Sequence, residues 1–165
     1  MILYLVRHGI AIDRADPNSP PEIERFLTRE GVKKTREAAE GIHALGVKPT
    51  VFITSPYTRA AQTAEIFAEV LGHPREKIRD SAALRPGSAP ADFLKELSHL
   101  KAREVIAFGH APHMDQVIAH AVGAHAVFTA LKKAGVACLE FASAGASKGT
   151  LVWLVPPKVL RHLDD

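Results

Sequence analysis

Five short apolar runs alternate along this chain with longer segments of helical periodicity, and this alternation limits the folds open to it. The runs are short enough to be buried strands, and they occupy residues 2–6, 51–54, 104–108, 135–141 and 150–155. Apolar residues recur every three to four positions between them, which predicts helices over residues 30–45, 56–71, 90–100 and 112–122. We therefore expect a three-layer α/β/α sandwich with a mostly parallel sheet. A short, turn-rich stretch separates the last two runs, which predicts a terminal hairpin and hence a mixed sheet.

Three predicted helices have start signals. Ser55 followed by Pro56 is typical of a helix N-cap with proline at the first helical position. Thr28 is placed to cap the first helix and Ser88 the third. Residues 13–25 are polar and proline-rich, which predicts a surface loop directly after the first strand region.

Length and composition place the chain among ordinary globular proteins. Its 165 residues correspond to about one domain, which we expect to span residues 1–165. The net charge of +3 is mild, and no cluster of Lys and Arg suggests a nucleic-acid partner. The lone Cys138 has no partner for an internal disulfide. Neither a membrane-spanning run nor a signal peptide is visible, so we expect a cytoplasmic protein.

Charged and imidazole side chains follow three of the predicted strands. Arg7 and His8 end the first, Arg59 lies in the first turn of the helix after the second, and His110 follows the third. If these strands are parallel, all four side chains face one crevice at their carboxyl ends, where ligands bind in open α/β sheets. Two arginines, two histidines and a helix N-terminus form a pocket suited to a phosphoryl group.

The same residues suggest a division of labour. An imidazole can attack phosphorus, while the arginines and the second imidazole hold the oxygens and spread the developing charge. His8 is the better nucleophile candidate, because the strand and Gly9 fix its position. We expect His8, Arg7, Arg59 and His110 to be catalytic, with substrate contacts from Arg7, Gly9, Arg59, His110 and Ala111.

The motifs together resemble the histidine phosphatase (phosphoglycerate mutase-like) superfamily, over essentially the whole chain. They are Arg7-His8-Gly9, Leu27-Thr28-Arg29-Glu30-Gly31, the run from Ser55 to Thr63 and Gly109-His110. The short length, with Leu84-Arg85-Pro86-Gly87, Gly109-His110-Ala111-Pro112 and Val127-Phe128-Thr129, resembles the small phosphohistidine phosphatases of the SixA type. The resemblance implies a phosphoglycerate mutase-like fold and a phosphorylated nucleophile at His8. It implies a phosphate pocket of Arg7, Arg59 and His110, with no metal and no other cofactor.

Two departures from the family pattern bear on the substrate. Many members carry a proton-donating glutamate where this chain has Leu84-Arg85-Pro86, and the other branch has an aspartate where this chain has Ala111. General acid help is typically worth ~10²–10⁴ in rate, so an alcohol leaving group is disfavoured here. An imidazole, with a pKa near ~6.5, leaves more easily. We therefore expect phosphohistidine on a signalling or phosphotransfer protein as the substrate, although Asp13, Asp115 and His113 remain alternative proton donors.

Other readings of these residues stay open. The chain can instead be a phosphatase of a small phosphorylated metabolite, or a phosphate- or phosphopeptide-binding module with negligible turnover. The run from His110 through His113 to Asp115 has the spacing of metal ligands, but the two arginines would repel a cation. Four further arginines can either rim the pocket, where they would meet an acidic or phosphorylated partner, or face solvent, which is our expectation: Arg14, Arg25, Arg29 and Arg85.

Overall fold

A computed structural model describes residues 1–163 and shows a six-stranded mixed sheet with helices on both faces. The strands are β1 (Ile2–Arg7), β2 (Val51–Thr54), β3 (Arg79–Asp80), β4 (Glu104–Gly109), β5 (Val136–Phe141) and β6 (Gly149–Val155), in the spatial order β3-β2-β4-β1-β5-β6. The first four pair in parallel, whereas β5 is antiparallel to β1 and β6 to β5. The predicted α/β/α sandwich and its terminal hairpin are confirmed.

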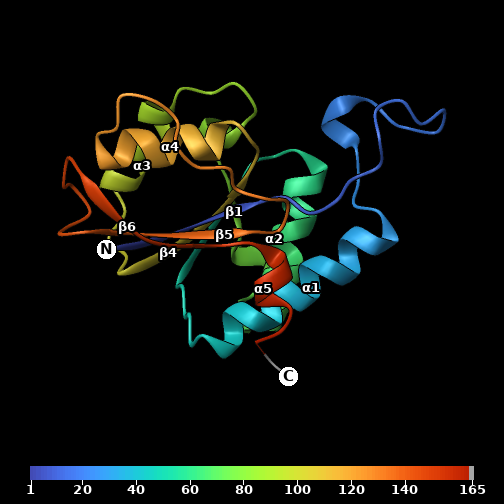
Figure 1. Cartoon of the computed structure of the whole chain (residues 1–165), viewed down its shortest axis with the longest axis horizontal. Helices are drawn as coiled ribbons and strands as arrows, with labels where there is room; N and C mark the ends of the chain where they lie inside the picture. Colours follow the sequence, from blue (N-terminus) through green and yellow to red (C-terminus); the bar gives the residue numbers. More distant parts are fainter. Residues whose placement is uncertain (164–165) are drawn as a thin grey trace.

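The helices form two layers. Helices α3 (Pro90–Ser98) and α4 (His113–Val122) cover one face, while α1 (Arg29–Ala44), α2 (Thr58–Leu71) and α5 (Pro157–Leu160) cover the other (Figure 1). Side chains along a strand alternate between the two faces, so β1 contributes Leu3 and Leu5 to one core cluster and Tyr4 and Val6 to the other. No helix among residues 1–163 has the length and apolar character that crossing a membrane requires.

Two of the three predicted helix caps are wrong. The Thr28 hydroxyl accepts a hydrogen bond from the Gly31 amide, as expected of an N-cap. Helix α2, however, begins at Thr58 with Tyr57 as N-cap, and α3 begins at Pro90 after Ala89. Ser55 lies outside its helix because its hydroxyl contacts His110, and the Ser88 hydroxyl donates to the Ala82 carbonyl.

The sequence analysis did not predict the shortest elements. Strand β3 has two residues and α5 has four, which is too little for a periodic pattern. Three 3₁₀ turns also occur, at Glu22–Glu24, Arg75–Lys77 and Ala82–Leu84. Two apolar residues assigned to the buried stripe of the first helix, Val32 and Leu45, are exposed, because the tight packing of α1 is made by Ala38, Ala39 and Ile42.

Candidate active site

The parallel pairing of β1 with β4 brings His8 and His110 side by side. Arg7 lies opposite Gly109 in the register, and the His8 amide extends the ladder by donating to the Gly109 carbonyl over 2.9 Å. The two imidazole rings, one residue beyond each strand, have centroids 5.2 Å apart. The pairing of the two strands therefore brings the two rings close together.

His8 is neutral and offers its Nε2 lone pair to the pocket. Its Nδ1 lies 2.7 Å from the Gly9 carbonyl oxygen, which can only accept, so Nδ1 carries the proton. Its Nε2 accepts a hydrogen bond from Arg59 Nε over 3.3 Å. Burial lowers the pKa of His8 to about 3, and the charges of Arg59 and Arg7 act in the same direction against the opposing Gly9 contact. The side chain is thus a free base at neutral pH, as a nucleophile must be.

Arg59 projects from the first turn of α2 into the same space and is only 2% exposed. Besides its contact with His8, its Nη1 donates to the Glu22 carbonyl and its Nη2 to Glu22 Oε1, both over 2.9 Å. Burial is the main cause that lowers the pKa of Arg59, with the Arg25 charge second. The guanidinium plane also lies over the Tyr57 ring, 5.2 Å from its centroid. Its orientation is fixed from several sides.

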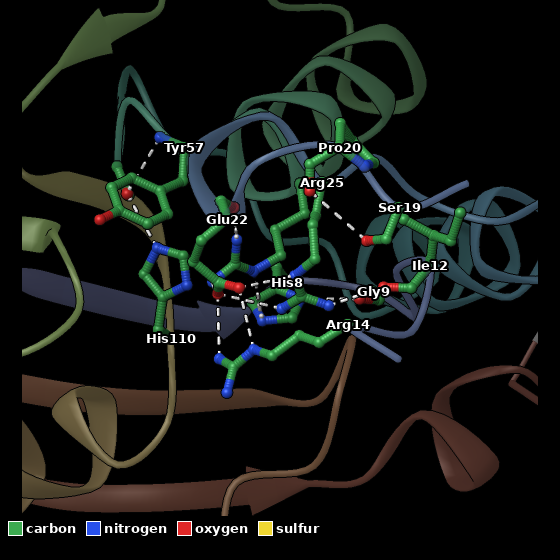
Figure 2. A network of polar contacts seen from close by, with 12 residues as sticks. His8, Gly9, Ile12, Arg14, Ser19, Pro20, Glu22, Arg25, Tyr57 and His110 are labelled. Carbon is green, nitrogen blue, oxygen red and sulfur yellow. Dashed lines mark hydrogen bonds and ion pairs between the residues drawn. The ribbon is translucent and has the colours of Figure 1, made fainter. Parts of the chain in front are cut away.

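Glu22 joins three arginines at the mouth of the pocket, and sequence reasoning missed it. In addition to Arg59, its carboxylate accepts from Arg14 Nε over 2.9 Å and Arg25 Nε over 3.0 Å (Figure 2). Partial burial alone would raise its pKa, but the hydrogen bonds from Arg25 and Arg14 outweigh this and lower it to about 2. Within the sequence, Glu22 is one acidic residue of a polar loop, and nothing in its neighbourhood marks it.

His110 is held by the loop after β2. Its Nε2 lies 2.8 Å from Ser55 Oγ, and the edge of the Tyr57 ring packs against it with centroids 5.3 Å apart. Its Nδ1 is buried and has no hydrogen-bond partner among residues 1–163. Burial is the main cause that lowers its pKa to about 3, with His8 and Arg59 contributing. This second neutral imidazole carries a polar atom without a partner.

Arg7, the last residue of β1, also lines the pocket. Its Nη1 donates to the Leu131 carbonyl over 3.0 Å, and burial lowers its pKa against the opposing effect of Asp115. Asp115 is itself engaged: one carboxylate oxygen accepts from Thr129 Oγ1 over 2.7 Å and from the Leu131 amide over 2.9 Å. Asp115 thereby holds the segment that positions Arg7.

These side chains border a pocket of about 320 Å³. The structure brings Arg7, His8, Arg59, His110 and Ala111 together around it. Gly9 lies behind His8 instead, where its amide donates to Thr63 Oγ1 and an added Cβ would meet Thr35. The remaining lining residues are Ala11, Asp13, Arg14, Arg25, Pro86 and Lys133. Of these, Asp13 was named from the sequence as an alternative proton donor.

The four arginines expected to face solvent divide into two groups. Arg14 and Arg25 line the pocket, and Arg25 is only 9% exposed, because the loop over residues 13–25 folds back against α2 through Glu22. The solvent-facing expectation is wrong for Arg25, whereas Arg14 lines the pocket and is also exposed to solvent. Arg29 and Arg85 are exposed and do not line the pocket. Loop 13–25 is therefore part of the pocket wall.

The alternative proton donors are also separated by the structure. Of Asp13, Asp115 and His113, only Asp13 lines the pocket. Asp115 and His113 are buried within α4, and burial is the main cause that lowers the pKa of His113. Among residues 1–163 there is no group of three or more His, Cys, Asp or Glu side chains that could hold a metal ion. The pocket is thus a cationic, nitrogen-rich site.

Comparison with known proteins places the chain in a family. The model of the histidine phosphatase superfamily (branch 1) matches residues 3–85. An uncharacterized protein of Picosynechococcus sp. is 36% identical over 97% of this chain and 99% of its own length.

Two solved structures share the fold at low sequence identity. The protein histidine phosphatase SixA, complexed with tungstate, is 23% identical with a TM-score of 0.85, covering 97% of this chain and 99% of that one. A mycobacterial glucosyl-3-phosphoglycerate phosphatase is 16% identical with a TM-score of 0.73, covering 94% and 98%. The fold therefore occurs both in a protein phosphatase and in a phosphatase named for a small metabolite. The substrate of this chain has to be argued from its site and not from its fold.

Proposed function

This chain belongs to the histidine phosphatase superfamily, and from that premise we propose that it hydrolyses phosphohistidine on a protein through a phosphoryl group held transiently on its own His8. The observation that carries the proposal is the Arg59 Nε–His8 Nε2 contact of 3.3 Å within a pocket that also contains Arg7 and His110. A neutral imidazole nitrogen faces a cationic cavity of about 320 Å³, which is large enough to admit a phosphoryl group.

In the first step His8 Nε2 attacks phosphorus in line with the leaving group. A new P–N bond forms at His8 while the P–N bond of the substrate breaks, and the substrate imidazole leaves neutral once its other ring nitrogen carries a proton. Arg59, Arg7 and the second imidazole, His110, contact the phosphoryl oxygens and stabilise the charge that develops on them. The Nδ1–H bond to Gly9 supports the positive charge that His8 gains.

In the second step water attacks phosphorus and the His8–P bond breaks. The water oxygen becomes part of inorganic phosphate, its displaced proton passes to solvent or to the phosphate, and His8 Nε2 returns to its free form. Water is the only co-reactant. Splitting the displacement in two replaces direct attack of water on the substrate by attack of His8, which the end of β1 already places in the pocket.

Proton supply favours a nitrogen leaving group. Pro86 and Ala111 line the pocket near the positions where a carboxylic acid would stand in other family members. Glu22 is ionised, because its arginine partners lower its pKa to about 2, so it has no proton to give at neutral pH. An alkoxide leaving group needs such a proton far more than an imidazole does. Asp13 is the one carboxylate among the lining residues, and one of its oxygens accepts a hydrogen bond from the Ala15 amide over 2.8 Å. The positions of Pro86, Ala111 and Glu22 support phosphohistidine over phosphoserine or a sugar phosphate.

Intact-mass measurement after incubation with phosphoramidate tests the intermediate. We expect one acid-labile phosphoryl adduct on the wild type and none on His8→Ala, with His43→Ala, an exposed histidine outside the pocket, as the matched control. Tight phosphate binding without adduct or turnover would instead identify a binding module.

Comparison of two peptides tests the substrate. An N-phosphohistidine peptide should be dephosphorylated at least ~10²-fold faster than the same sequence with phosphoserine, because only the latter needs general acid help. Faster release from phosphoserine, or from a sugar phosphate, would contradict the substrate class while leaving the His8 intermediate intact.

A further inference from the structure

A second pocket, of about 520 Å³, adjoins the candidate active site and has no role in the steps above. Its lining residues come from α1, α5, the segment before β5 and the end of β1. Helices α1 and α5 lie side by side on the same face of the sheet (Figure 1). Arg7 and Lys133 line both pockets, so the second pocket is a direct neighbour of the active site. A polypeptide that places its phosphoryl group in the active site would bring its flanking residues close to the second pocket.

The charge of the second pocket is one-sided. Six cationic residues line it and no acidic residue does: Arg7, Lys34, Lys132, Lys133, Lys158 and Arg161. Two of them have ion-pair partners, since Lys34 pairs with Glu30 and Arg161 lies 3.8 Å from Glu37. The ion pairs within residues 1–163 do not include Lys132, Lys133 or Lys158. The pocket is an electropositive concavity beside the catalytic one.

The floor of the second pocket is tightly packed. Gly31 packs so closely on the Ile10 carbonyl that a Cβ would collide with it, and the Ala134 amide donates to the Arg7 carbonyl over 2.9 Å. Ile10, Ala134 and Pro157 supply apolar surface between the cations. The position of the lysines is thereby tied to the strand that carries His8.

Three buried polar atoms at this pocket have no hydrogen-bond partner among residues 1–163. They are Thr35 Oγ1, Arg7 Nε and Arg161 Nε. These atoms are shielded from solvent, so a ligand in the pocket meets instead the exposed lysines that line it: Lys132, Lys133 and Lys158. Carboxylates are suitable partners for these cations.

We propose that the second pocket binds an acidic segment of the phosphoprotein substrate, flanking its phosphohistidine. The inference rests on the proposed function and adds a partner chemistry to it: carboxylate side chains on the polypeptide that presents the phosphoryl group. Charge complementarity and the position of the second pocket beside the active site, where Arg7 and Lys133 border both, carry it. Apolar surface between the cations accommodates the backbone and aliphatic parts of such a segment.

The test uses two synthetic N-phosphohistidine peptides with identical sequences, except that one carries glutamates around the phosphohistidine and the other glutamines. For the wild type we expect kcat/KM for the glutamate peptide to be at least ~5-fold higher, with a steeper decline in salt. In the Lys34→Glu/Lys158→Glu variant the preference should disappear or invert. Hydrolysis of phosphoramidate, which is too small to reach the second pocket, should stay unchanged and reports that the variant is folded.

A charge-matched control is Lys77→Glu/Lys95→Glu, at two exposed positions outside both pockets, and it should keep the glutamate preference. If the first variant folds poorly, Lys34→Gln/Lys158→Gln makes the same comparison with a smaller expected loss. Equal rates for the two peptides, or a preference that survives in the pocket variant, would overturn the inference. Failure of the enzyme to cleave either peptide or phosphoramidate would instead overturn the proposed function.

Discussion

Glu22 Oε1 lies 2.9 Å from Nη2 of Arg59, so the most deeply buried cation of the pocket carries a counter-ion supplied by the loop over residues 13–25. The same carboxylate contacts Arg14 and Arg25. A phosphoryl group that enters this pocket meets a carboxylate already bound to the cations it would use. Glu22 therefore has two opposing effects, because it orients Arg59 and competes with anionic ligands.

Glu22→Gln should strengthen the binding of anions. With the negative charge removed, inorganic phosphate or tungstate no longer competes with a carboxylate, and we expect its competitive inhibition constant to fall by about 5- to 30-fold. The neighbouring exposed Glu24→Gln should leave the constant unchanged. Weaker inhibition of the Gln variant would show that orientation of Arg59 outweighs competition.

Arg59→Lys should behave almost as badly as Arg59→Ala. The planar guanidinium contacts His8 Nε2, the Glu22 backbone carbonyl and Glu22 Oε1 at the same time, and a single ammonium group cannot do so. We expect kcat/KM for phosphoramidate to fall by ~10²–10³ in both variants, the scale seen when one charge-stabilising donor is removed. Arg29→Lys, at an exposed position outside the pocket, is the matched control. Full activity in the Lys variant would exclude a need for the fork geometry.

His8 should stay neutral well below pH 6.5. Burial, aided by the charges of Arg59 and Arg7, lowers its pKa to about 3, and NMR titration of the imidazole resonances can follow this directly. Comparison with the spectrum of His8→Asn identifies its signals. Bound phosphate should raise the midpoint, because a dianion beside the ring favours its charged form. A midpoint near 6.5 in the ligand-free protein would contradict the burial argument.

The free energy of unfolding should decrease as the pH falls from about 6.5 towards 3. His8 and His110 are neutral in the folded protein in this range but take up protons when unfolded, so the unfolded state binds more protons and acid favours it. Each such imidazole contributes at most about 1.4 kcal/mol per pH unit. Urea unfolding at pH 7 and pH 5 should show the loss, and His110→Gln should reduce it. An equal loss in the variant would assign the effect to other groups.

Gly31→Ala should destabilise the fold although alanine is the better helix former. A Cβ at this position would collide with the Ile10 backbone, which cannot move without displacing the segment after His8. We expect a loss of about 2 kcal/mol in the free energy of unfolding, measured by urea denaturation. Lys33→Ala, an exposed position of the same helix, should change it by less than about 0.5 kcal/mol. A neutral Gly31→Ala would show that α1 can shift away from Ile10.

Much of the fold was predictable because the signals are local. Strand β2 (Val51–Thr54) begins and ends at the predicted residues, and β1 and β4 differ by a residue at one end. A run of apolar residues that ends in Arg7-His8 or Gly109-His110 indicates both the strand and the point where it ends. Parallel pairing then brings the ends together at one edge of the sheet.

Features that depend on contacts between distant segments were not predictable in this way. Ser55 has the local chemistry of a helix cap, yet its hydroxyl binds His110, 55 positions away in the sequence. Glu22 is an ordinary residue of a polar loop until that loop folds onto Arg59. The identity of such a partner cannot be read from neighbouring residues, because it depends on how distant segments pack together.

The sequence by itself determined the strand–helix order and the placement of Arg7, His8, Arg59 and His110 at the ends of elements, because periodicity and turn chemistry act over neighbouring residues. Only the tertiary structure decided that Glu22 neutralises Arg59 and that Lys34 and Lys158 share a second pocket. Each of those arrangements joins side chains far apart in the chain, and their free energy arises only when the sheet and both helix layers are assembled.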